Sequence, residues 1–148
     1  MTDHPPRLFA SDAAVHRIGE GLLARTLSRA EWTHEAHLAA AAWAILARPD
    51  LVPERDFPAI IAAYNDAAGD GNGDDHGYHE TITQGSIAAV RAALARTDPA
   101  ATLHARVNAV LQAPEGRRDW LLGVYTRETL FSREARRTHV APDRTPRP

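Results

Sequence analysis

Apolar residues recur along most of the chain at intervals of three or four positions, which places them on one face of an α-helix. Val15, Ile18 and Leu22 follow this spacing in the first such segment, and Leu103 and Val107 follow it in a later one. No stretch shows the apolar–polar alternation of a β-strand over a useful length. The pattern therefore predicts an all-α protein.

Capping residues and prolines divide this pattern into separate helices. The expected helical segments cover about 11–27, 33–48, 56–68, 78–96 and 98–113, followed by short helical pieces over 117–138. Ser11 and Thr33 are suitable N-caps for the first two segments. Pro58 stands near the start of the third, and Asp98-Pro99 is typical of a cap followed by a first helical position. Five or six helices of this kind predict a helical bundle.

The length of 148 residues corresponds to one domain with one core. We expect residues 1–148 to form a single helical domain. Pro5 and Pro6 mark residues 1–10 as an irregular N-terminal arm, and the Pro-rich segment 141–148 is expected to be a tail.

Composition and charge exclude several classes of function. The formal net charge is −2 with no long block of one sign, so we expect neither nucleic acid nor a membrane surface as a partner. The absence of cysteine excludes disulfides, thiolate catalysis and cysteine-ligated zinc. All 17 basic residues are Arg, which indicates a high-GC bacterial genome and excludes Schiff-base chemistry on Lys. Without a visible signal peptide or spanning segment, the expected location is cytoplasmic.

Three of the eight histidines are placed so that they can share a site. His34 and His37 are three positions apart, which puts their side chains about 60° apart on one helix. Leu38 continues the same face, so both rings should point inward. His79 falls in line with Ile82 in the first turn of the fourth segment. If these two helix starts lie side by side, the three imidazoles converge.

Such a convergence predicts a small metal-dependent enzyme. His34, His37 and His79 would bind a divalent ion, and three neutral ligands with one open position suit Zn, Fe, Ni or Cu. Glu80 would act as a general base or support a ligand, and Tyr78 or Tyr125 would orient a small-molecule substrate. The His-Glu-Ala-His run at 34–37 is one residue too short for a zinc-protease motif, so we exclude that class.

Two other functions remain open from the residues alone. The same histidines could perform acid–base chemistry without a metal, or could bind a small ligand. Alternatively, the histidines could be structural, and the arm and tail could dock a partner. The Gly-rich loop 69–77 directly precedes His79 and is a candidate lid. The metal, the substrate and the oligomeric state are not determined by the sequence.

The chain also resembles a family of small bacterial proteins with the pattern (F/W)THxxHL, then YHETIT, then YSxExLxSxxAR and a closing PD. The matching segments are EWTHEAHL at 31–38, GYHETIT at 77–83, the stretch 125–136 and Pro142-Asp143. Thr126 stands where the pattern prefers Ser. The family has no assigned activity, so the resemblance implies a site containing His34, His37 and His79, and implies no reaction.

Overall fold

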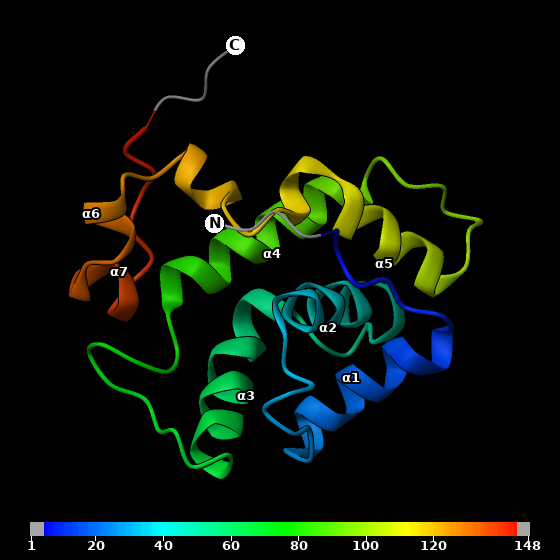
Figure 1. The fold of residues 1–148 in the computed structure, drawn as a ribbon, viewed down its shortest axis with the longest axis horizontal. Helices are drawn as coiled ribbons and strands as arrows, with labels where there is room; N and C mark the ends of the chain where they lie inside the picture. The colour runs from blue at the N-terminus through cyan, green and yellow to red at the C-terminus, as the bar shows by residue number, and fades with distance from the viewer. Residues whose placement is uncertain (1–4, 145–148) are drawn as a thin grey trace.

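The computed structural model describes residues 5–144, which fold into a single compact bundle of α-helices (Figure 1). No strand occurs among these residues. The helices are α1 (Asp12–Ala24), α2 (His34–Ala47), α3 (Pro53–Ala67), α4 (Glu80–Leu94), α5 (Leu103–Gln112), α6 (Arg127–Leu130) and α7 (Arg133–Arg137), with short 3₁₀ helices η1 (Pro114–Gly116) and η2 (Trp120–Gly123) between α5 and α6. The prediction of an all-α bundle is confirmed, and its five longer helices agree with the expected number.

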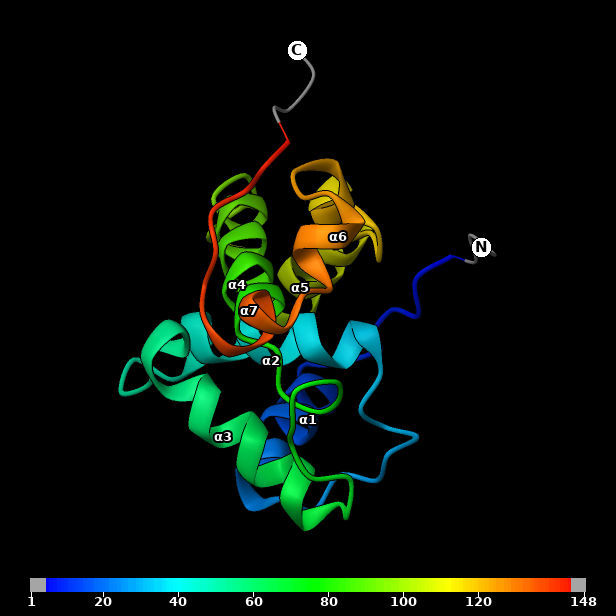
Figure 2. The ribbon, with the colours of Figure 1, turned by 90° about the vertical axis from the view of Figure 1, so that its left-hand side faces the viewer.

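Helix α2 is the central element of the bundle. Figure 2 shows it running between α4 and α5 on one side and α1 and α3 on the other, and it contacts all four. Its residues from Leu38 to Ala44 are all buried. A helix that is apolar on all sides belongs in the interior, and the short alanine side chains allow the neighbouring helices to approach closely.

The first two helices begin at their predicted caps. The Ser11 hydroxyl accepts a hydrogen bond from the Ala14 amide at 3.2 Å, and the Thr33 hydroxyl accepts one from the Ala36 amide at 3.1 Å. The first helix ends at Ala24, earlier than expected, because Arg25 adopts a left-handed conformation with φ of 62°. Such a residue ends the helical hydrogen-bond series.

The starts of α4 and α5 differ from the prediction. Helix α4 begins at Glu80, and His79, which was expected inside the first turn, is its N-cap. Helix α5 begins at Leu103 with Thr102 as its cap, whereas Asp98 caps a separate turn by accepting the Ala100 amide at 2.9 Å. In both places a side chain competes with the helix for backbone amides, and sequence spacing alone does not decide that competition.

Helix α3 begins at Pro53, so Pro58 lies inside it rather than near its start. A proline has no amide hydrogen, which leaves the carbonyl four residues earlier without its helical partner. That carbonyl belongs to Glu54, and it accepts a hydrogen bond from Nε2 of Gln84 in α4 at 2.9 Å. A neighbouring helix thus satisfies the acceptor that the internal proline leaves free.

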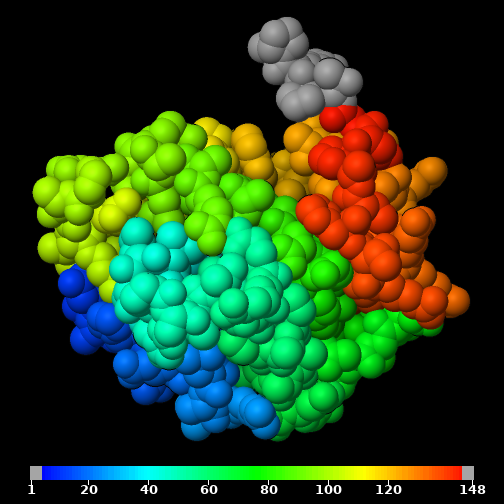
Figure 3. All heavy atoms as spheres, turned by 180° about the vertical axis from the view of Figure 1, so that it is seen from behind, coloured from blue at the N-terminus to red at the C-terminus, as the bar shows by residue number. Residues whose placement is uncertain are grey.

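The described part of the predicted tail is packed against the bundle. Asp143 accepts hydrogen bonds from the Thr126 amide at 2.7 Å and the Thr129 hydroxyl at 2.6 Å, and the Arg144 amide donates to the Val124 carbonyl at 2.9 Å. Figure 3 shows this C-terminal segment, in red, lying against its neighbours. Residues 145–148 of the predicted tail lie outside the described residues.

The end of the predicted N-terminal arm is also held in place. The Phe9 backbone exchanges two hydrogen bonds with the Asn108 side chain of α5, at 2.8 and 2.9 Å. Residues 1–4 of the arm lie outside the described residues. Within the described part of the chain, no helix is long and apolar enough to cross a membrane.

Candidate functional site

A cavity of about 530 Å³ opens where the start of α2 meets α3, the start of α4 and α7. Its volume is in the range of small-molecule sites. Polar side chains and apolar side chains both line it: Arg29, Trp32, His37, Ile61, Asn65, Asp70, His76, Tyr78, His79, Ile82, Thr83, Phe131 and Arg136. We refer to this space as the His37 cavity.

His37 presents one free ring nitrogen to this cavity. Its Nδ1 lies 2.7 Å from the carbonyl oxygen of Thr33, one turn earlier in the chain. A carbonyl only accepts hydrogen bonds, so Nδ1 carries the proton and Nε2 keeps its lone pair. No residue in the described part of the chain donates to Nε2. The ring also stacks on Trp32, with centroids 3.8 Å apart and planes inclined by 29°.

The environment of His37 favours a neutral ring. Burial among surrounding protein atoms lowers its pKa to about 4, and the nearby His34 and Arg29 lower it further, against the opposing effect of the bond to Thr33. The side chain is nevertheless exposed to solvent. Water therefore reaches the ring, and what the arrangement supports is the direction of the shift: His37 is neutral at pH 7.

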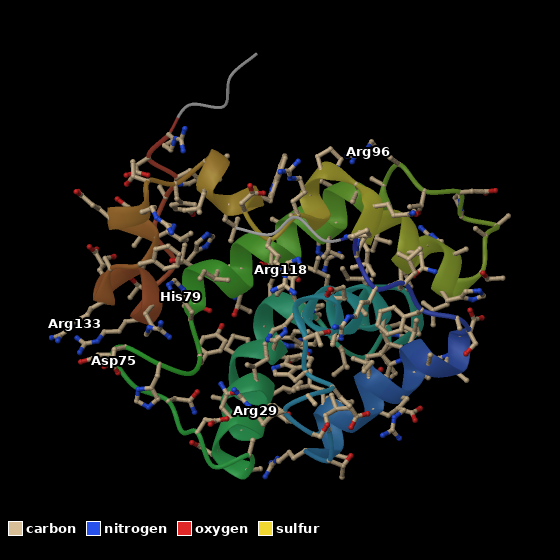
Figure 4. The ribbon with its side chains drawn as sticks, in the orientation of Figure 1. Arg29, Asp75, His79, Arg96, Arg118 and Arg133 are labelled. Carbon is tan, nitrogen blue, oxygen red and sulfur yellow. The ribbon has the colours of Figure 1, made fainter. Side chains whose placement is uncertain are left out.

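His79 has no free ring nitrogen. Its Nδ1 accepts the Ile82 amide at 3.1 Å as the N-cap of α4, and its Nε2 donates to the Leu130 carbonyl at 2.8 Å. The residue is 7% exposed, and burial lowers its pKa, which keeps the ring in the neutral form that a cap requires. Figure 4 shows His79 at the start of α4, beside α6 and α7. His79 therefore joins two parts of the fold at the cavity wall.

Tyr78 and Glu80 form a hydrogen-bonded pair next to His79. The Tyr78 hydroxyl donates to Oε1 of Glu80 at 2.5 Å, and Nε2 of Gln84 donates to the same oxygen at 3.3 Å. Burial and the bond to the Glu80 carboxylate both raise the pKa of Tyr78. Tyr78 thus stays protonated and lines the cavity, whereas Glu80 is not among the residues that line it.

The loop 69–77 is anchored rather than loose, with Asn72 at its centre. The Asn72 Oδ1 accepts from the Asn65 side chain at 3.1 Å and from the Tyr78 amide at 2.9 Å. Its Nδ2 donates to the Ala62 carbonyl at 3.0 Å. Gly77 has φ of 76°, and a Cβ there would lie 2.4 Å from the Gly71 carbonyl. The predicted lid is therefore a folded wall of the cavity in this structure.

Ion pairs hold both ends of this wall. Arg29, from the connector before α2, pairs with Asp70 at 2.6 Å. Arg137 of α7 pairs with Asp74 at 2.6 Å, and the adjacent Arg136 donates through Nη1 to the Gly77 carbonyl at 3.0 Å. Helix α7 and the connector therefore fix the loop from opposite ends of the chain.

His34 lies in a different place from the other two histidines. It lines a second cavity of about 180 Å³, together with Leu38 and Ser86, and its Nε2 donates to the Gly116 carbonyl at 2.8 Å. Ile82 and Phe131 line both cavities. The expectation that His34 and His37 point into one site is therefore wrong, because 60° of rotation carries them to separate cavities.

The three-histidine metal site is not supported by this arrangement. The described residues contain no group of three or more His, Asp or Glu side chains positioned for a metal ion. His79 would have to break two hydrogen bonds to act as a ligand, and His34 faces another cavity. The donor set needed for Zn, Fe, Ni or Cu is thus not brought together, and we derive no chemistry from a metal.

Tyr125, a predicted substrate-orienting residue, is part of the core. It is 2% exposed and does not line the His37 cavity. Its hydroxyl donates to the Val140 carbonyl at 2.7 Å, and burial raises its pKa. Its place in the sequence pattern is explained by this link, which attaches the C-terminal segment to the chain before α6.

Sequence analysis missed several residues of the cavity. Trp32 and Arg29 belong to a connector without helical periodicity, and Asn65 lies on α3, which carries no predicted site residue. Arg136 appeared to be part of an exposed basic cluster. Their only advance signal was proximity in sequence to the histidine segments and, for Arg136, a place in the third segment of the family pattern.

Comparison with known protein families, with curated proteins and with solved structures finds no match for this chain. The likeness to the bacterial family therefore rests on the sequence pattern alone.

Proposed function

We propose that the protein binds a small polar molecule in the His37 cavity and uses His37 as a hydrogen-bond and proton acceptor. This is the metal-free form of the histidine site that the sequence leaves open. The cavity volume of about 530 Å³ and its mixed polar and apolar walls support it.

The state of His37 is the observation that carries the proposal. The bond from Nδ1 to the Thr33 carbonyl fixes the tautomer, and stacking on Trp32 fixes the ring plane. A lowered pKa keeps the ring neutral. A neutral imidazole held in one tautomer, with its free lone pair toward a cavity, accepts a proton from a bound hydroxyl or amine without first reorienting.

The other groups of the cavity have supporting roles. The protonated Tyr78 stays hydrogen-bonded to Glu80, so this pair holds the wall and offers the phenol oxygen as a second acceptor. Thr83 adds a hydroxyl, and Trp32 with Ile61 supplies apolar surface. Together these residues favour a ligand with both a polar donor and a carbon framework.

The metal-dependent enzyme stays a prediction from the sequence. The geometry favours the metal-free site over it, since only His37 among the three histidines has an unengaged nitrogen at the cavity. Metal analysis of protein purified without a histidine tag separates the two. Stoichiometric zinc, iron, nickel or copper, lost in the His79→Ala variant, would count against the metal-free site.

A ligand screen tests the proposal directly. A panel of small hydroxylated and amino compounds is added to ¹⁵N-labelled protein, and hits must shift the Trp32 indole and His37 ring signals. The His37→Gln variant should lose at least about tenfold in affinity for such hits, because it removes the acceptor. His139→Gln is the matched control, since His139 is exposed and does not line the cavity. Equal losses in both variants would reject the assignment to His37.

A further inference from the structure

The charges around the His37 cavity do not balance. Arg29 is paired with Asp70 at 2.6 Å, and His76 is hydrogen-bonded to Asp75 at 2.7 Å. Arg136 is the remaining charged side chain of the lining. Among the described residues no carboxylate pairs with its guanidinium, in contrast to the adjacent Arg137, which pairs with Asp74.

Arg136 is held in position by backbone groups. Its Nη1 donates to the Gly77 carbonyl at 3.0 Å and lies 3.4 Å from the Tyr78 carbonyl. The side chain is half-buried, and the part of the chain that the structure describes offers no acceptor to its Nε or Nη2. Those two nitrogens form the edge of a guanidinium that binds a carboxylate or phosphate through two parallel hydrogen bonds.

No other group of the lining supplies the missing negative charge. His37 and His79 have their pKa values lowered, so both rings are neutral at pH 7. Burial and Glu80 raise the pKa of Tyr78, so the phenol keeps its proton. The lining therefore has an excess of one positive charge, located at Arg136.

We propose that the molecule bound in the His37 cavity is a small organic anion whose carboxylate or phosphate group pairs with Arg136. This inference rests on the function proposed above and adds the ligand class. The carbon part of the anion would lie against Trp32, Ile82 and Phe131, which also line the cavity. Its hydroxyl or amine would reach His37, and the anion would neutralise the guanidinium that the protein itself leaves unpaired.

Matched probes separate the charge of the ligand from its shape. The carboxylate probe is 4-hydroxybenzoate, and its uncharged counterpart is 4-hydroxybenzamide. Phenyl phosphate against phenol makes a second pair that distinguishes phosphate from carboxylate recognition. Binding is followed through the Trp32 indole and Arg136 guanidinium signals, in the wild type and in the variants Arg136→Gln, Arg136→Lys and Arg133→Gln.

In the wild type we expect the anion of at least one pair to bind about tenfold more tightly than its neutral partner, as for a charge-assisted hydrogen bond. Arg136→Gln should abolish this preference while leaving the affinity for the neutral probe unchanged. Arg136→Lys should retain part of the preference, since it keeps the charge and loses the fork. Arg133→Gln is the matched control on the same helix. Arg133 is exposed and outside the cavity lining, so the preference should persist.

The outcomes distinguish the two proposals. If neutral and anionic probes bind equally and both shift the Trp32 signal, the cavity binds small molecules and the assignment to anions is wrong. If the preference survives in Arg136→Gln, the anion is held elsewhere and the inference is also overturned. If no probe of either kind shifts the Trp32 signal, the proposed function fails together with the inference. Unchanged affinity of the neutral probe shows that each variant keeps a folded cavity.

Discussion

The roles of the three histidines depend on what their ring nitrogens meet. His34 and His79 both donate Nε2 to carbonyls, of Gly116 and Leu130 respectively. His37 instead donates Nδ1 to Thr33 in its own helix, which leaves Nε2 free at the cavity. The sequence correctly selected His37 and His79 as neighbours of one cavity, and it could not reveal which nitrogens were already occupied.

The titration of His37 follows from its surroundings. Its pKa is about 4 in the folded protein against 6.5 for an unperturbed histidine. Between these values the unfolded chain binds a proton that the folded protein does not, so the free energy of unfolding falls as pH decreases from 6.5 to 4. In NMR titrations His37 should stay in the Nδ1–H form at pH 6.

His37→Gln provides the control for this pH dependence. The melting temperature of the variant should fall less than that of the wild type over the same interval. Some acid destabilisation will remain, because His79 also has a lowered pKa. A His37 ring that titrates near 6.5 would contradict the neutral proton acceptor on which the proposed function depends.

At the scale of elements, the loop before α4 contributes a wall of the site through its backbone. Asn72 connects it to α3 and to the Tyr78 amide, and glycines with positive φ allow its turns. The sequence predicted a loop from its glycine and aspartate content. Its fixed shape depends on long-range contacts with Arg29, Arg136 and Arg137, which helical periodicity does not report.

Gly77→Ala should destabilise this wall. The substitution combines a left-handed φ of 76° with a contact of 2.4 Å between the new Cβ and the Gly71 carbonyl. We expect a loss of about 2 kcal/mol or more in the free energy of unfolding, measured by urea denaturation. Gly123→Ala is the control, since its Cβ would meet nothing within 4 Å. Equal stability of the two variants would show that the loop does not require this turn.

The C-terminal segment is a second element whose role the structure decides. Tyr125→Phe removes the hydrogen bond to the Val140 carbonyl and keeps the buried ring. We expect a loss of about 1 kcal/mol in the free energy of unfolding, with unchanged affinity for any molecule that binds in the His37 cavity. A variant of wild-type stability with impaired binding would instead return Tyr125 to the site.

At the scale of the whole molecule, α2 organises the bundle. Trp43 of α2 is 1% exposed, packs against Gly19 of α1 and donates through Nε1 to the Nδ1 of His16 at 2.9 Å. Gly19, which weakens α1 by helix propensity, is required because only a residue without a side chain fits beneath the indole. The close crossing of α1 and α2 therefore depends on one glycine.

Gly19→Ala should disturb this crossing. The added Cβ would lie 2.1 Å from the Trp43 ring, and the buried indole has no space in which to move away. Overpacking of this kind costs about 1–3 kcal/mol in the free energy of unfolding. Thermal and chemical unfolding measure it. Glu20→Ala, at the exposed neighbouring position, should change stability little. A Gly19→Ala protein as stable as the wild type would contradict the packing described here.

The sequence by itself determined the helical class, the caps at Ser11 and Thr33, and the inward direction of His37, because these follow from local spacing and local hydrogen bonds. The tertiary structure alone decided that His34 and His37 enter different cavities, that His79 caps α4, and that Arg136 lines the cavity without a carboxylate partner. The physical reason is range: helical periodicity specifies which face of a helix is buried, whereas the partner of each buried nitrogen comes from residues distant in the chain.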